Sequence, residues 1–219
     1  MMNDTLTDFD FSTLVKAIQQ THEQMAAQVG RAVNAGLTLR NWLIGAYIAE
    51  YELSGADRAS YGDNLLNELS RALRRHKISS VGSRQLYNYL AFYKVYPQIV
   101  GTVSLQNRQL LPKTMDFEKL RTVSAKLKVS SDKLVNNLSY SHFELLTSLG
   151  HDLQRSFYEI ECIRGNWSVR ELKRQIGSLY FERSGLSNNK EKLSEMVQAG
   201  AEQAGGKLAD RCHPGGIPI

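Results

Sequence analysis

The chain has 219 residues, enough for one large domain or two small ones with a buried core. Hydrophobic residues make up 42% of it and exclude wholesale disorder, and the presence of only four prolines favours long helices over a loop-rich β fold. The net charge of +5 is compatible with a polyanionic partner but does not establish one.

The cysteines and the N-terminus bear on the compartment. Cys162 and Cys212 are the only cysteines, so we do not expect a disulfide framework. Residues 1–11 are acidic and polar and lack the basic and apolar regions of a secretory signal. No apolar stretch approaches the ~18 residues needed to span a bilayer. We therefore expect a soluble, cytoplasmic protein without a membrane partner.

The first predicted element is a long helix that begins near Ser12, which can cap it. Apolar positions recur along one side of this helix as a seam, and two interpretations of the seam stay open. Either the helix packs on its own domain, or the seam is a self-association surface that makes the protein a homo-oligomer. The stretch from Leu37 to Leu53 is expected to be the best-buried helix of this part of the chain. The seam positions alternate spacings of four and three, as in a coiled coil: Phe11, Val15, Ile18, His22, Met25, Val29, Ala32 and Gly36.

Two shorter helices follow, at about 62–75 and 83–96. The first ends in the basic run from Arg74 to Lys77, and a short connection leads to Ser83 as a plausible cap. Pro97 ends the second helix. Because two helices joined by a short turn have the helix-turn-helix layout, we predict a helix-turn-helix-like unit at about 62–96.

The second half of the chain is also predicted to be helical. Residues 98–138 are interpreted as loops with one short helix at about 116–127, and a small hairpin there is not excluded. Further helices are predicted at 141–149, 152–164 and 168–183, the last with Ser168 and Glu171 as a capping box. The predicted fold class is all-α, a helical bundle with a long N-terminal helix. Residues 1–97 and 98–203 form two parts of one domain, and 204–219 form a disordered tail.

The strongest functional signal is a run without acidic residues. No Asp or Glu occurs from Leu69 to Met115, whereas the same run holds Arg71, Arg74, Arg75, Lys77, Arg84, Lys94, Arg108 and Lys113. A surface of one sign attracts phosphates and releases their counterions. A solvated face usually mixes signs. A nucleic-acid interface is the preferred interpretation, and a solvated face or an acidic protein partner are the alternatives.

The candidate nucleic-acid-binding residues lie on this helix pair: Arg71, Arg74, Arg75, Lys77, Arg84, Tyr87, Asn88 and Lys94. On the second helix, the face with Leu86, Tyr89, Leu90 and Tyr93 should pack inward, opposite Arg84, Tyr87, Asn88, Ala91 and Lys94. We expect Arg74, Arg75 and Lys77 to contact phosphates of duplex DNA. Arg84 and Asn88 are expected to face the groove, and all five side chains should be exposed.

Catalysis finds little support in the residues. Glu171-Leu172-Lys173 has the Glu-x-Lys form of a metal-dependent nuclease, but it lies in a helical pattern with no strand before it. The histidines show no metal-ligand spacing, and no phosphate-binding loop or nucleophile motif occurs. A second basic group, Arg164, Arg170, Lys173, Arg174 and Arg183, is diluted by Glu171 and Glu182 and is interpreted as a solvated face. We expect no catalytic residue, metal, cofactor or small-molecule substrate.

Several short motifs together resemble the N-terminal domain of the YhcG family, also called the domain of unknown function 1016. They are Leu39-Arg40-Asn41-Trp42-Leu43-Ile44-Gly45, Tyr61-Gly62, Leu86-Tyr87-Asn88-Tyr89, Phe92-Tyr93, Tyr96-Pro97, Leu138-Ser139-Tyr140-Ser141-His142-Phe143 and Asn166-Trp167-Ser168-Val169-Arg170-Glu171-Leu172. The resemblance covers roughly residues 12–203, with the motifs in the family's order.

The resemblance implies a bacterial, cytoplasmic protein whose helical, helix-turn-helix-like front domain precedes a nuclease domain of the PD-(D/E)XK type. After Leu208 the chain departs from that pattern, and we expect the nuclease domain to be absent. The expected function is a non-catalytic DNA-binding and self-association module. A structural or protein-interaction module that does not bind nucleic acid is the alternative.

Overall fold

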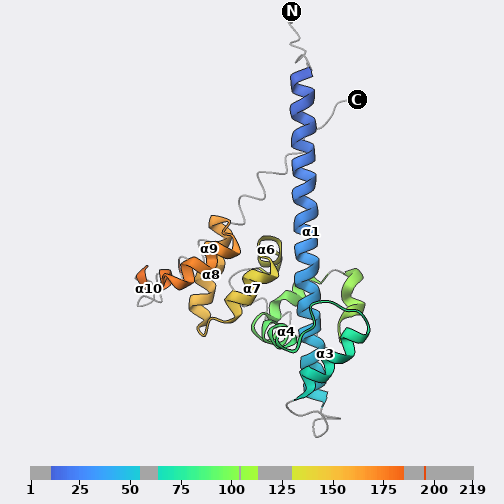
Figure 1. The fold of residues 1–219 in the computed structure, drawn as a ribbon. Helices are drawn as coiled ribbons and strands as arrows, with labels where there is room; N and C mark the ends of the chain where they lie inside the picture. Colours follow the sequence, from blue (N-terminus) through green and yellow to red (C-terminus); the bar gives the residue numbers. More distant parts are fainter. Residues whose placement is uncertain (1–10, 55–63, 104, 113–129, 185–194, 196–219) are drawn as a thin grey trace, which may run out of the picture.

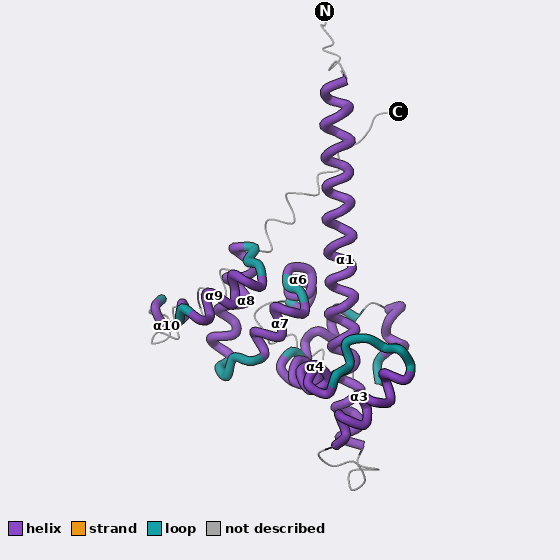
Figure 2. The backbone as a smooth tube through the Cα atoms, in the orientation of Figure 1, coloured by secondary structure: helices purple, strands orange, loops and turns teal. Residues whose placement is uncertain are grey.

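The computed structural model describes residues 11–54, 64–103, 105–112, 130–184 and 195. Every regular element in this part of the chain is a helix, which confirms the all-α class (Figure 2). The α-helices are α1 (Phe11–Ser54), α3 (Leu65–Arg75), α4 (Ser83–Val95), α6 (Ser131–Asn137), α7 (Tyr140–Thr147), α8 (Asp152–Gly165), α9 (Val169–Gly177) and α10 (Tyr180–Arg183). Two 3₁₀ helices, η2 (Pro97–Thr102) and η3 (Leu105–Leu110), lie between α4 and α6. None of the described helices has both the length and the apolar character to cross a bilayer.

The predicted long N-terminal helix is confirmed. α1 is one helix of 44 residues, so the seam and the apolar stretch that begins at Leu37 are continuous. Its first half is exposed and projects beyond the other helices (Figure 1). From Thr38 onward α1 is largely buried, because Trp42, Ala46 and Ile48 enter the core beside α4. One helix therefore has a packed half and a free half.

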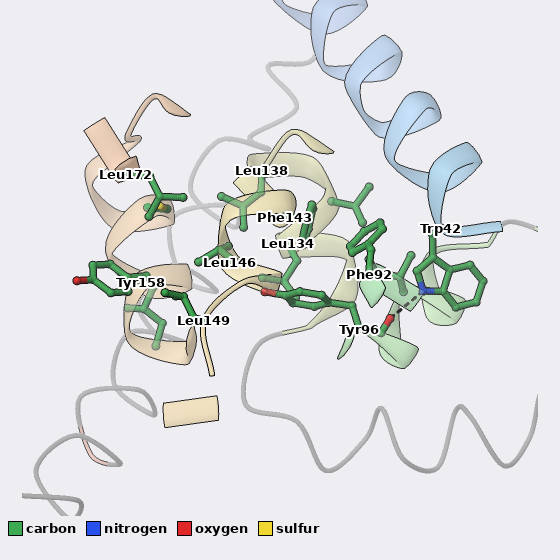
Figure 3. Packing of buried hydrophobic residues seen from close by; sticks show 14 of the residues in the cluster. Trp42, Phe92, Tyr96, Leu134, Leu138, Phe143, Leu146, Leu149, Tyr158 and Leu172 are labelled. Carbon is green, nitrogen blue, oxygen red and sulfur yellow. Dashed lines mark hydrogen bonds between the residues drawn. The ribbon is translucent and has the colours of Figure 1, made fainter. Parts of the chain in front are cut away.

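The core is built around α4, which packs against α1, α3 and α7. The indole N–H of Trp42 on α1 donates to the carbonyl oxygen of Tyr96 at 2.8 Å (Figure 3). The ring of Phe143 on α7 lies 4.9 Å from that of Phe92 and 5.0 Å from that of Tyr96. Aromatic pairs at such distances contribute about 0.5–1.5 kcal/mol each beyond the area they bury. These contacts fix α4 from two sides.

Gly45 is where α1 comes closest to α4. A Cβ atom at this position would overlap the carbonyl group of Tyr89 and would lie 2.9 Å from the Cβ of Tyr93. Only glycine therefore allows the two helix backbones to approach this closely.

Residues 130–184 contribute α6 to α10 to the same core. Leu134, Leu146 and Leu172 are fully buried in the cluster that also contains Trp42. In the region interpreted as loops, η2 packs against α6 and buries Ile99. The short helix predicted at 116–127 and the tail at 204–219 lie outside the described residues. The described residues of 98–138 contain no strand.

The single helix predicted at 168–183 is wrong. α9 ends at Gly177, and α10 starts at Tyr180 after Leu179, whose φ of 54° is left-handed. Gly177 favours a break here, because glycine is unfavourable in a helix interior. The turn after it allows Phe181 to pack against Phe157 in the core. Leu179 itself is exposed.

Candidate nucleic-acid interface

α3 and α4 are joined by the turn at residues 76–82, which both helices and α1 hold in place. The backbone reverses through left-handed residues, Lys77 with φ 58° and Ser80 with φ 59°. The Tyr89 hydroxyl donates to the carbonyl oxygen of Ser80 at 2.9 Å, and the Arg40 guanidinium donates to that of Ser79 at 3.0 Å. The turn is longer than the short connection predicted at 78–82, because Arg75 is the last residue of α3.

Two of the predicted cations are paired with acidic residues. Arg71 forms an ion pair with Glu68 at 2.6 Å, and Lys94 forms one with Glu52 of α1 at 3.3 Å. Glu52 lies far from Lys94 in the sequence, so the acid-free run does not exclude this pairing. The charges of two candidate nucleic-acid-binding residues are therefore partly neutralised.

Four predicted cations are exposed and make no ion pair with a described residue. Among the described residues, Arg74, Arg75, Lys77 and Arg84 have no acidic partner within ion-pair distance. The Arg74 guanidinium reaches across the turn to Gly82, where a Cβ atom would lie 3.5 Å from it. Positive charge from the end of α3 thus lies close to the start of α4.

The inward face of α4 is largely as predicted. Leu86, Tyr89 and Leu90 are buried, whereas Tyr93 is half-buried. Arg84, Tyr87 and Lys94 are exposed, with Tyr87 at 61%.

The expected exposure of Asn88 is wrong. Its side chain is half-buried, and its amide donates to Glu144 of α7 at 2.7 Å. α7 covers this side of α4, which leaves Ala91 half-buried too. The free surface of α4 is therefore a narrow stripe through Arg84 and Tyr87.

The family described as the DUF1016 N-terminal domain matches residues 14–183. The chain belongs to this family. It is also 36% identical over 172 residues to the protein named "Putative nuclease YhcG" from Escherichia coli (strain K12). That match covers 77% of this chain but 44% of the relative, so the chain spans less than half of that protein's length. No solved structure matches the chain. The resemblance read from the short motifs is confirmed.

In this DUF1016 N-terminal domain, sequence reasoning missed the position of Arg40. This half-buried side chain donates to Asn41 as well as to the turn, and its charge lowers the pKa of Tyr89. Burial has the larger effect on Tyr89 and leaves its pKa raised. A hollow of about 330 Å³ opens beside these residues and is lined also by Tyr140 and Glu144. The only signal for Arg40 was its place in the motif from Leu39 to Gly45.

The described acidic residues do not form a metal site. Among the described residues no group of three His, Cys, Asp or Glu side chains is arranged to hold a metal ion. Glu171 lies on α9, where hydrogen bonds from Arg174 and Gln175 lower its pKa. Glu161 is buried and pairs with Arg164 at 3.3 Å. Burial raises the pKa of the Cys162 thiol to about 12, which disfavours the nucleophilic thiolate.

Proposed function

We propose that this DUF1016 N-terminal domain is a cytoplasmic, non-catalytic module that binds duplex DNA through α3 and α4 and self-associates through α1. The observation that carries the first part is the set of four exposed cations around the turn that have no acidic partner among the described residues. The relative's printed name is that of a nuclease, so such a module would hold nucleic acid for a nuclease to act on.

The arrangement suits phosphate contacts. Arg74, Arg75 and Lys77 are exposed at the end of α3 and in the turn, and each can replace counterions on a phosphate. Arg84 lies in the first turn of α4, the part of a helix that most often approaches a groove. Tyr87 presents a ring and a hydroxyl one helical turn further on. A solvated face would interleave acidic side chains here, and the nearest one in the sequence, Glu68, is already paired with Arg71.

The salt dependence of binding tests this surface. Changing Arg74, Arg75 and Lys77 together to Ala should flatten the log-log salt slope on duplex DNA by roughly two to three, at about 0.9 per lost phosphate contact. All sequences should be weakened about equally, because phosphates carry no sequence information. The strain at Lys77 should not change, because Ala and Lys both carry a Cβ atom. Fluorescence anisotropy over a salt series measures the slope.

The control changes Lys16 and Arg31, which are exposed on the free half of α1, to Ala and so removes two charges, against three in the triple variant. It should leave the slope near that of the unmodified chain. An unchanged slope in the triple variant, with the helical signal and melting temperature intact, would favour the solvated face or an acidic protein partner. The assay is run in EDTA and in Mg²⁺, and the duplex should stay intact in both.

Self-association is supported by the free half of α1. Its large apolar side chains are exposed, Ile18 at 60% and Val29 at 64%. At 100° per residue, the large exposed apolar residues lie within one half of the helix circumference, whereas Lys16, Glu23 and Arg31 lie on the other half. An apolar stripe of this kind, roughly 40 Å long at 1.5 Å per residue, is the seam by which helices pair. A second copy of the chain carries the same apolar stripe and is therefore the partner with a complementary surface.

Placing charges in the seam should separate the copies. The double variant Ile18→Glu with Met25→Glu should be monomeric by light scattering, because each assembly would bury carboxylates against apolar side chains. Gln20→Glu with Ala27→Glu adds the same charge to the opposite face of α1 and should preserve the oligomer. A monomeric mass for the unmodified chain at micromolar concentration would contradict the proposal.

A structural module without nucleic-acid binding is the second candidate, and the exposed seam alone would suit it. The two candidates differ in the salt series. A chain that forms oligomers but shows no salt-dependent binding to duplex DNA would be a structural module.

A further inference from the structure

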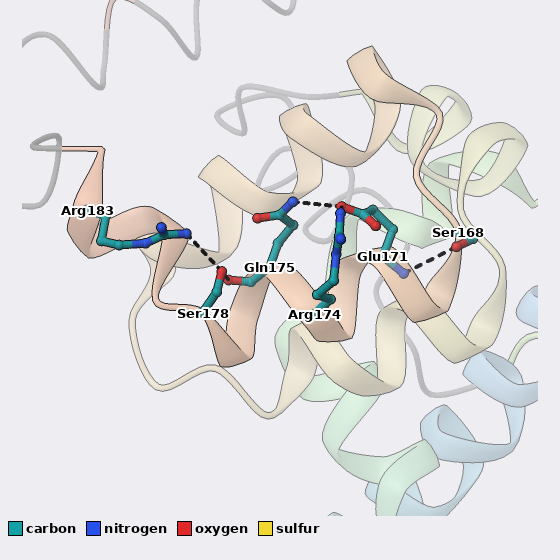
Figure 4. A network of polar contacts seen from close by, with 6 residues as sticks. All are labelled: Ser168, Glu171, Arg174, Gln175, Ser178 and Arg183. Carbon is teal, nitrogen blue, oxygen red and sulfur yellow. Dashed lines mark hydrogen bonds and ion pairs between the residues drawn. The ribbon is translucent and has the colours of Figure 1, made fainter.

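α8 and α9 form a second helix-turn-helix, with a shorter connection than that between α3 and α4. α8 ends at Gly165, and only residues 166–168 precede α9. Asn166 adopts the left-handed conformation, with φ 47°, and the N–H of Trp167 donates back to the carbonyl oxygen of Cys162 at 3.0 Å. The Ser168 hydroxyl then caps α9 by accepting from the N–H of Glu171 at 3.2 Å (Figure 4). A connection of three residues is the length typical of DNA-binding helix pairs.

α7 supports this pair from behind. It packs against both α8 and α9. The Nδ1 atom of His142 accepts from the N–H of Ser139 at 3.2 Å, so its Nε2 atom carries a proton and donates to the carbonyl oxygen of Trp167 at 3.0 Å. Leu172 anchors α9 in the core with no exposed surface. The connection is thereby fixed, which holds α9 at a defined angle on the surface.

The outer face of α9 is basic and open. Arg170, Lys173 and Arg174 are exposed on it. Arg174 pairs with Glu171 at 2.7 Å (Figure 4), whereas Arg170 and Lys173 have no acidic partner among the described residues. Gly177 continues the same face, and no atom of the described residues lies within 4 Å of where its Cβ atom would be. A nucleic-acid backbone could therefore approach this face closely.

α9 is also more accessible than α4. α4 packs against α1, α3 and α7, which leaves a narrow exposed stripe, whereas the main packing partners of α9 are α7 and α10. A helix that enters the major groove needs one face free along its length, and its N-terminal residues are the ones that reach the base edges. Arg170 lies in the first turn of α9, and Lys173 lies one turn further on. The sequence alone suggested a solvated face for α9 and did not indicate that the turn at residues 166–168 is held in place by α7.

We propose that α9 is a second DNA-contacting helix of this domain, docked in the major groove with Arg170 and Lys173 against the duplex. This inference rests on the proposed function, because it assumes that duplex DNA is the ligand. It assigns to α3 and α4 the role of contacting the backbone at a separate position.

The test compares three variants of the full chain on the same duplex over a salt series. Arg170→Ala with Lys173→Ala should flatten the log-log slope by roughly two, at about 0.9 per contact. Lys16→Ala with Arg31→Ala removes the same charge from α1 and should change the slope little. Arg170→Lys with Lys173→Arg keeps both charges and should restore the slope, which a merely structural role of these side chains would not require.

The outcomes separate the two proposals. A native slope in the Arg170 and Lys173 double Ala variant, with a flattened slope in the Arg74, Arg75 and Lys77 variant, overturns the α9 inference and leaves the proposed function standing. A flattened slope in the α9 variant alone supports α9 as a DNA-contacting helix and overturns the proposed role of α3 and α4. An unmodified chain that shows no salt-dependent binding to duplex DNA overturns both.

Discussion

Glu159 is a carboxyl group enclosed in the core of the domain. It is 7% exposed, and it accepts a hydrogen bond from the Tyr96 hydroxyl at 2.7 Å. Burial raises its pKa to about 7, although the Tyr96 hydrogen bond and the charge of Arg155 act in the opposite direction. In the unfolded chain the same group ionises near its ordinary value of 4.5. Between these two values the folded state therefore holds a proton that the unfolded state has lost.

Replacing Glu159 by Gln should change how stability depends on pH. Glu159 contributes its full stability below about pH 4.5, and that contribution is lost as the pH rises through about 7. Gln cannot ionise, so from pH 5 to pH 8 the variant should gain on the order of 2–3 kcal/mol in unfolding free energy relative to the unmodified chain. Urea denaturation at the two pH values measures this. Glu23→Gln, on the exposed half of α1, is the control, and parallel pH profiles for Glu159→Gln and the unmodified chain would refute the assignment.

Individual residues were predictable from the sequence where helical periodicity decides their environment. Leu86, Tyr89 and Leu90 share one face of α4 and are buried as predicted, because a single helix determines which face they occupy. Asn88 was not predictable, since its partner Glu144 belongs to α7 and no local pattern places α7 beside α4. The pairing of Lys94 with Glu52 was missed for the same reason. Charge runs describe neighbours in sequence, whereas ion pairs form between neighbours in space.

At the scale of elements, the contact between α1 and α4 depends on Gly45. Gly45→Ala would place a methyl group against the Tyr89 carbonyl and force the two helices apart. We expect a loss of about 2 kcal/mol or more in unfolding free energy, as for other overpacked cores. Gly30→Ala, in the exposed half of the same helix, meets nothing within 4 Å and should stabilise α1 by up to about 1 kcal/mol. Urea titrations followed by circular dichroism should show opposite signs for the two variants, and equal effects would contradict this packing.

Helix positions were predicted better than helix ends and breaks. Pro97 locates the end of α4 to within a residue or two, because this signal is local. The cap predicted at Ser83 is wrong, because Ser83 is the first residue of α4 and no side-chain cap hydrogen bond forms there. The break between α9 and α10 was missed, since Gly177 alone does not reveal that Phe181 must turn into the core. The helix-turn-helix of α8 and α9 was missed for a related reason. Its turn is held by His142 of α7, which is distant in the sequence.

At the scale of the whole molecule, the all-α class and the family were predictable, and the arrangement of the helices was not. Scarce prolines and repeated apolar spacing determine the class, and short motifs in a fixed order identify the family. The shared core, in which Trp42 of α1 and Leu172 of α9 belong to one cluster, arises from contacts between distant segments. Composition and periodicity contain no information about such contacts.

With the proposed self-association, the free half of α1 would link folding and assembly in a single equilibrium. A lone helix exposed to water on every side is only marginally stable, because few contacts offset the entropy of ordering its backbone. Burial of the seam between copies would supply those contacts, so the ordered length of α1 would vary with protein concentration. Dilution would then unwind the helix from Phe11 towards Thr38, where the packed half begins. Any ligand that binds several copies at once, such as a long duplex, would raise their local concentration and restore the helical conformation of this half of α1.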